Sequence, residues 1–121
     1  MSDQQSELPE VLNVKEEGSQ CVLSVRVPDN CKWFDGHFEG APILSGVAQI
    51  DWMMTLAERY LKLDRGFAGL EVLKFHNVIQ PGDELDITLN WVREKHALRF
   101  EINGAARCSS GRVLLQAGVS S

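Results

Sequence analysis

The segment that most constrains the fold is an apolar helical run from about Ser45 or Gly46 to Lys62. Its apolar residues recur at helical spacing and cover most of its circumference, and up to Ala57 its only charged residue is Asp51. This pattern predicts a central helix that is buried on nearly every side. A lone carboxylate in such surroundings must be paired, solvated by a cavity or protonated, because an unpaired buried charge is costly.

Alternation of apolar and polar residues predicts short strands on both sides of this helix. Two are expected before it, Val11–Lys15 and Gln20–Val27, joined by a turn at Gly18-Ser19. Four are expected after it: Phe67–Phe75, Leu85–Trp91, Leu98 towards Cys108, and Val113–Val119. The predicted turns between the last four are Gln80–Asp83, Glu94–His96 and Ser109–Gly111.

Strands segregated from a single helix predict an α+β fold in which an antiparallel sheet wraps around the helix. A chain of 121 residues is long enough for one such domain, spanning 1–121, but not comfortably for two. Residues 1–9 are polar and read as a flexible tail.

Composition excludes several classes of function. A net charge of −5 argues against nucleic-acid binding and against a polybasic membrane-surface protein. No window is apolar enough for a membrane span, and the N-terminus does not resemble a secretory signal. Three widely spaced cysteines, without metal-ligand spacing, predict reduced thiols in a cytoplasmic protein and no bound metal.

Two titratable residues and one backbone position suggest acid–base chemistry. His37 lies between Gly36 and Gly40 in the segment leading into the helix, fourteen residues before Asp51. The helix start at Gly46 offers unpartnered N–H groups to a carbonyl oxygen. Such parts can remove a proton beside a carbonyl and expel a hydroxyl group. Alternatively, Asp51 caps a neighbouring backbone group or pairs with an arginine, and His37 has only a structural role and is held by a hydrogen bond.

The segment HFEGAPILSGVAQID resembles the motif of hot-dog-fold 3-hydroxyacyl-[acyl-carrier-protein] dehydratases of the FabZ and FabA type. Within that family, GVAQIDW, KFHNVIQPGDEL and SSGRVLL are similar to segments of the small, ApeI-like dehydratases of aryl polyene biosynthesis. The resemblance covers about residues 33–116 and implies a hot-dog fold, a curved antiparallel sheet around one long central helix.

The resemblance also implies roles for particular residues. His37 is expected to take the α-proton, Asp51 of a partner subunit to protonate the leaving hydroxyl, and Gly46, with Phe38, to hold the thioester oxygen. It further implies a dimer, either with itself or with another hot-dog subunit, and no cofactor. The acyl chain is expected to enter a tunnel at the dimer interface. Candidates to line it, each of which could instead be plain core, are Trp33, Phe34, Ile50, Trp52 and Met54.

This chain departs from the family motif at three positions. Ser45 replaces the proline before Gly46, Glu39 replaces the proline after His-Phe, and Thr55 replaces a frequent glutamine. The Ser45 departure makes the start of the helix less rigid than a proline would.

Alternatives to a dehydratase are a hot-dog thioesterase and an inactive acyl-binding subunit. The substrate of a dehydratase is expected on the phosphopantetheine of an acidic acyl carrier protein. Because this chain is acidic as well, docking needs a local basic patch, for which the candidates are Arg59, Lys62, Arg65 and Lys74. The sequence does not predict the length or aryl character of the acyl chain.

Overall fold

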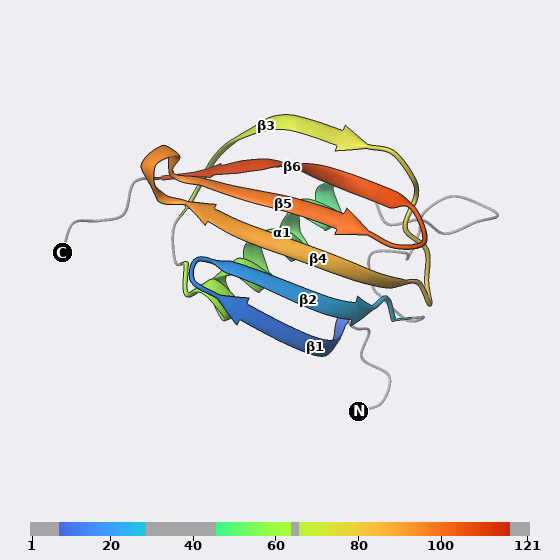
Figure 1. The fold of residues 1–121 in the computed structure, drawn as a ribbon. Helices are drawn as coiled ribbons and strands as arrows, with labels where there is room; N and C mark the ends of the chain where they lie inside the picture. The colour runs from blue at the N-terminus through green and yellow to red at the C-terminus, as the bar shows by residue number, and fades with distance from the viewer. Residues whose placement is uncertain (1–7, 29–45, 64–65, 117–121) are drawn as a thin grey trace, which may run out of the picture.

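A computed structural model describes residues 8–28, 46–63 and 66–116 of the chain. In them, one helix, α1 (Gly46–Leu61), lies behind a six-stranded antiparallel sheet (Figure 1). The strands are β1 (Glu10–Glu17), β2 (Gln20–Arg26), β3 (Phe67–Phe75), β4 (Glu84–Val92), β5 (Ala97–Asn103) and β6 (Arg107–Leu115). A short 3-10 turn, η2 (Arg93–Lys95), joins β4 to β5. The predicted α+β architecture is confirmed.

The order of strands across the sheet is β1-β2-β4-β5-β6-β3. β3 therefore lies at one edge, beside the last strand, although it precedes β4 in the chain. β1 forms the other edge and pairs only with β2 among the described strands. The chain thus leaves α1, runs along the far edge of the sheet, and returns to its middle through β4.

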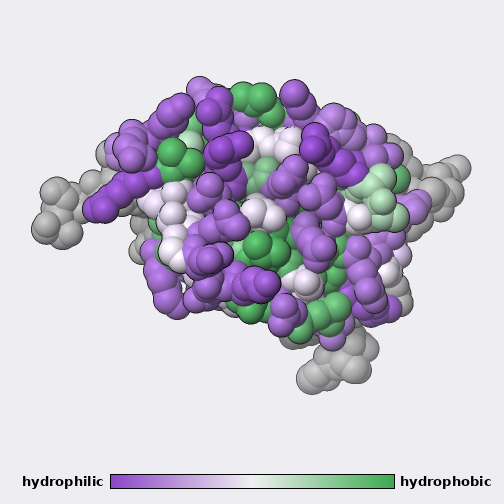
Figure 2. All heavy atoms as spheres, viewed as in Figure 1, coloured by the Kyte–Doolittle hydropathy of each residue, from purple (hydrophilic) through white to green (hydrophobic). Residues whose placement is uncertain are grey.

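Apolar side chains from neighbouring strands align in rows on the face that α1 covers. Leu23 of β2 is paired with Ile87 of β4, which is paired with Ile102 of β5, and all three are fully buried. From the other side α1 contributes its own buried face, which consists of Ala48, Gln49, Trp52, Met53, Leu56 and Ala57. The opposite face of the sheet is mostly covered by hydrophilic side chains (Figure 2).

The prediction of a helix buried on nearly every side is wrong for the chain by itself. Val47 is 75% exposed, and Asp51 and Glu58 are exposed as well. The reason is geometric, because a single sheet covers only one side of a helix. The apolar residues on the other side remain available to a surface outside this chain.

The turns at Gly18-Ser19, Gln80–Asp83 and Glu94–His96 are confirmed. Gly18 and Gly82 have φ angles of +62° and +87°, which few other residues adopt without strain. The Gly82 N–H also donates a 2.8 Å hydrogen bond to the Val27 carbonyl, which ties this turn to the end of β2.

The predicted turn at Ser109–Gly111 is wrong, because these residues lie inside β6. The chain turns instead at residues 104–106, where Gly104 donates a backbone hydrogen bond to the Ala106 carbonyl. Gly111 faces Phe100 across the sheet, and a Cβ at Gly111 would lie 2.5 Å from Leu73 Cδ2. This glycine therefore serves close packing within a strand.

Candidate active site

The first turn of α1 is held against the end of β3. The ring of Phe75 lies so close to Gly46 that an added Cβ would be 2.9 Å from Phe75 Cζ. Glycine permits this approach, and it leaves the first backbone N–H groups of the helix unobstructed by a side chain of their own. Such groups have no partner within the helix and can donate to a carbonyl oxygen or an anion.

Asp51 lies one and a half turns further along α1, on the face that the sheet does not cover. Its side chain is exposed, as is that of Val47, while Ile50 and Met54 beside it are half-buried. The carboxyl group is thus surrounded by apolar neighbours on an open helical face. A carboxyl group in this position can contact a substrate or a second subunit that binds to the exposed face of α1.

Trp52, a candidate for the acyl tunnel, is fully buried in the core of the chain. This position favours the core-packing alternative that the sequence left open. Ile50 and Met54 differ from Trp52, since they pack only partly against the core and share the open face with Asp51. Of the three candidates on α1, these two remain accessible from the open face.

The other candidates for this site lie outside the described residues. They are His37, Phe38, Trp33 and Phe34, together with Ser45 and Glu39 of the family motif and Arg65. The pairing of His37 with Asp51 therefore stays a prediction.

A buried polar pair that the sequence did not predict joins α1 to the sheet. Ser109 Oγ of β6 donates a 2.7 Å hydrogen bond to Gln49 Oε1. Gln49 is 4% exposed and Ser109 is fully buried. The available signal was a glutamine inside an otherwise apolar run, but its partner sixty residues away could not be found from spacing.

The β3 edge exposes several large apolar side chains. Phe67, Leu70, Val72 and Phe75, all on β3, are between 40% and 55% exposed, and we refer to them jointly as the β3 edge patch. An edge strand also presents backbone N–H and C=O groups that a further strand can pair with. An apolar edge next to an apolar helical face is typical of a surface that another subunit covers.

The predicted basic residues do not form one patch among the described residues. Arg59 and Lys62 lie at the C-terminal end of α1, where Lys62 Nζ donates to the Arg59 carbonyl at 3.4 Å. Lys74 precedes Phe75, which contacts the opposite end of the helix at Gly46. A 16-residue helix spans about 24 Å, so Lys74 is remote from the other two.

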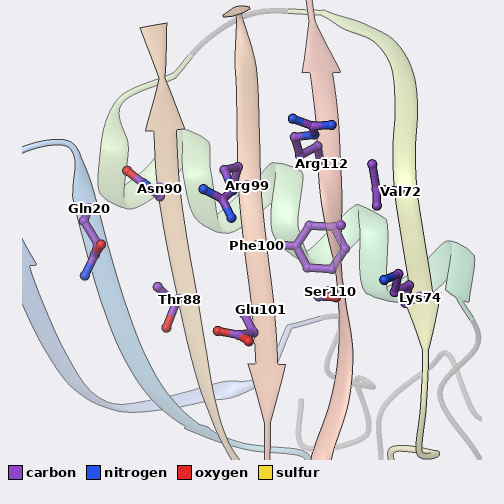
Figure 3. Close-up of a pocket in the computed structure, with 11 residues that line it drawn as sticks. Gln20, Val72, Lys74, Thr88, Asn90, Arg99, Phe100, Glu101, Ser110 and Arg112 are labelled. Carbon is purple, nitrogen blue, oxygen red and sulfur yellow. The ribbon is translucent and has the colours of Figure 1, made fainter.

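Lys74 instead belongs to a shallow groove of about 570 Å³ on the face of the sheet turned away from α1 (Figure 3). Arg99 and Arg112 lie directly opposite each other on β5 and β6 in this groove. Arg112 forms a 3.4 Å ion pair with Glu71, and Glu101 also lines the groove. This surface lies across the sheet from Asp51.

The two described cysteines are free and have no place in this site. Burial raises the pKa of the Cys21 thiol and of the Cys108 thiol.

In residues 8–28, 46–63 and 66–116, no three His, Cys, Asp or Glu side chains are grouped so that they could hold a metal ion. No helix within these same ranges is long and apolar enough to cross a membrane.

Solved structures with a similar fold include enzymes. The dehydratase heterocomplex ApeI:P from Xenorhabdus doucetiae contains a chain 32% identical to this one, with a TM-score of 0.84, covering 90% of this chain and 98% of that one. An uncharacterized protein from Erwinia carotovora subsp. atroseptica is 35% identical, with a TM-score of 0.78, covering 89% and 95% of the two chains. The predicted hot-dog fold is confirmed by these likenesses.

Curated relatives agree with this likeness. The 3-hydroxyacyl-[acyl-carrier-protein] dehydratase FabZ of Haemophilus influenzae (strain PittEE) is 31% identical over 114 residues, covering 83% of this chain and 76% of the relative. The FabZ of Oenococcus oeni is 30% identical over 111 residues, covering 81% and 79%. The family model of the ApeI-like ApeI dehydratases matches residues 13–112. The chain therefore belongs to the ApeI-like family of hot-dog dehydratases.

Proposed function

We propose that this dehydratase acts on a 3-hydroxyacyl thioester borne by an acyl carrier protein and releases the trans-2-enoyl thioester and water. The proposal is supported by the FabZ relatives, whose names state this substrate class. It is also supported by the similarity to an ApeI dehydratase, which favours a place in aryl polyene or fatty-acid-like biosynthesis.

The observation that carries the proposal is the position of Asp51. Its carboxyl group stands on an open helical face, flanked by Ile50 and Met54, and follows the helix start at Gly46 by five residues. A purely structural acid in a helix is expected to bind a cation or a backbone N–H group within its own chain. An exposed acid among apolar neighbours is better placed to act on a ligand bound against this face.

In the proposed reaction, His37 removes the α-proton of the substrate while the Gly46 N–H donates a hydrogen bond to the thioester oxygen. The C–O bond at the β-carbon then breaks, and Asp51 gives its proton to the leaving hydroxyl group, which departs as water. His37 ends the cycle protonated and Asp51 ionised, so the net transfer of one proton from His37 to Asp51 restores the enzyme.

We propose that Asp51 and His37 meet across a dimer interface. Two surfaces of the chain support a partner: the open face of α1 around Val47, and the β3 edge patch. The partner is a second copy of this chain or another hot-dog subunit, and the heterocomplex known for the similar ApeI makes the second arrangement a specific candidate. Sedimentation of the purified chain, alone and with a co-expressed candidate subunit, distinguishes the two.

The function is tested by offering a short 3-hydroxyacyl thioester on carrier protein and on pantetheine. Formation of enoyl absorbance without free thiol is expected. Release of thiol without enoyl product would establish a thioesterase instead. Absence of both, for the chain alone and together with its partner subunit, would leave the inactive acyl-binding subunit as the correct assignment.

Docking of the carrier protein is proposed at Arg59 and Lys62 near the end of α1, at Arg65, and at Lys74 as a separate position. Because Lys74 lies near the other end of the helix, reversal of its charge is expected to act independently of Arg59 and Lys62. If reversal of all four charges leaves the rate on carrier-bound substrate unchanged, the docking proposal fails.

We also propose a cytoplasmic location, which the free thiols of Cys21 and Cys108 support.

A further inference from the structure

The start of α1 is attached to the sheet at two adjacent points. Gly46 and Gln49 are three residues apart and therefore lie on the same side of the helix. Phe75 and Ser109 are paired directly opposite each other on β3 and β6. The Phe75 ring covers Gly46, and the Ser109 hydroxyl binds Gln49. Two neighbouring sheet positions thus hold two neighbouring helical positions.

The two contacts differ in the freedom they leave to the helix. Contact with Phe75 is apolar and non-directional, so it persists through a small rotation of α1 about its axis. The hydrogen bond from Ser109 to Gln49 is 2.7 Å long and directional, so rotation breaks it. Breaking it costs a buried hydrogen bond, which makes other rotations of the helix unfavourable.

The strand end of this hydrogen bond is fixed. Ser109 is fully buried and is paired on one side with Ile102 of β5 and on the other with Phe75 of β3. It therefore cannot follow a rotating helix without disturbing two strands. Ser109 is thus a fixed point in the sheet, and its hydrogen bond to Gln49 fixes the position of α1 relative to the sheet.

The consequence appears on the opposite side of the helix. Each residue advances about 100° around an α-helix, so Asp51 is about 200° from Gln49. A rotation that shifts Gln49 within the core therefore shifts Asp51 on the open face by a similar amount. We infer that Gln49 and Ser109 are positioning residues for dehydration: their buried hydrogen bond sets the rotation of α1 and hence the place of the Asp51 carboxyl group. This inference rests on the proposed function.

The test separates positioning from stability. Ser109→Ala removes the hydrogen bond to Gln49 and is expected to lower both the melting temperature and kcat. In the double variant Ser109→Ala with Gln49→Met, an apolar side chain of similar length replaces the amide. Both partners of this hydrogen bond are then removed, and the melting temperature is expected to rise above that of Ser109→Ala.

The rate constants of the double variant decide the matter. We expect kcat to remain about 10- to 100-fold below wild type while KM changes little. The reason is that the Asp51 carboxyl group is displaced slightly from the reacting atoms, while the substrate still binds. If kcat recovers together with the melting temperature, the pair serves only folding and the inference is overturned.

A matched control comes from the same buried face of α1. Leu56→Ala leaves a cavity two turns away and is expected to lower the melting temperature without lowering kcat, measured well below the transition. If Leu56→Ala lowers kcat as much as the double variant does, any disturbance of the helix has this effect and the inference is overturned.

A failure of the proposed function gives a different result. If the wild type does not convert a 3-hydroxyacyl thioester, the crystal structures of the wild type and the double variant still test the positioning. The Asp51 carboxyl group is expected to differ in position by about 1 Å or more, the scale on which catalytic geometry is sensitive. An unmoved Asp51 in the double variant overturns the inference.

Discussion

The ring of Phe75, at the end of β3, lies directly against Gly46, the first residue of α1. A methyl group on Gly46 would approach Phe75 Cζ to 2.9 Å, so Gly46→Ala requires the ring or the helix start to move. Because Phe75 is half exposed, the ring can yield, and stability is expected to fall by only about 1 kcal/mol. The added methyl group also obstructs the approach of a substrate to the N–H group that we propose as the donor to the thioester oxygen, and kcat/KM is expected to fall at least tenfold.

Gly69→Ala is the matched control for that change, since Gly69 lies on the same strand as Phe75. An added Cβ at Gly69 meets Leu114 at an ordinary van der Waals distance of 3.7 Å. This variant is expected to keep both the melting temperature and kcat/KM of the wild type. Wild-type kinetics in Gly46→Ala would show that the helix start does not hold the substrate.

Asp51→Asn removes the proposed acid but keeps the shape of the side chain. Since the side chain is exposed, the free energy of unfolding is expected to change by no more than about 0.5 kcal/mol. The dehydration rate is expected to fall at least about 100-fold, because Asp51 is the proposed donor of the proton to the leaving hydroxyl group. Chemical denaturation and enoyl absorbance measure the two effects.

Glu58→Gln controls for the loss of a negative charge on the same exposed side of α1, since it lies seven residues, or two turns, after Asp51. It is expected to leave the rate unchanged. An equal loss of rate in both variants would indicate a general electrostatic effect in place of proton donation.

Leu70→Lys places a charge in the β3 edge patch and is expected to weaken the proposed dimer. Leu12→Lys, on the opposite edge strand, is the matched control, since Leu12 is 50% exposed and Leu70 is 40% exposed. Sedimentation velocity is expected to show more monomer for Leu70→Lys alone, with loss of activity in proportion. A monomer that retains full activity would refute an active site shared between subunits.

The buried thiols predict a dependence on alkaline pH. Burial raises the pKa of Cys21 and of Cys108 in the folded state, so the folded chain retains these protons after the unfolded chain has lost them. Their contribution to stability is thus fully present at neutral pH and declines as the pH rises above about 8.5, the ordinary value for a thiol.

The same burial predicts slow reaction with thiol reagents. In a Cys31→Ser background, dithionitrobenzoate at neutral pH is expected to react with Cys21 and Cys108 only as fast as the chain unfolds. Addition of denaturant is expected to release two equivalents at once. Rapid reaction of either thiol in the native state would contradict the buried positions.

The sequence was sufficient to predict the elements that depend on local pattern. The helix, the alternating strands and three of the turns follow from periodicity and, at Gly18 and Gly82, from glycine at positions of positive φ. The polar residues within SSG were misread as a turn, because Ser109 is paired inside the core and Gly111 makes room for Leu73 and Phe100. Both roles depend on partners distant in the chain.

The residues of the candidate site likewise divide into those that a single segment of sequence reveals and those that only the structure reveals. Asp51 and Gly46 could be chosen from one segment, since an acid in an apolar run and a glycine at a helix start are visible there. Gln49 could not be assigned a role from the sequence, because its partner Ser109 lies sixty residues away in the chain. The outward orientation of Asp51 also required the structure, since composition does not say which face of an apolar helix the sheet covers.

The bulge in β3 has a consequence for the fate of a chain without its partner. Pairing between β3 and β6 shifts register between Glu71 and Lys74, and Val72 in this interval has a φ of +54°, an unfavourable angle for a β-branched residue. A regular apolar edge would be a template on which any extended segment could polymerise. This irregular edge is expected to interrupt such growth after a few residues and so to disfavour edge-to-edge polymerisation of chains that lack a partner.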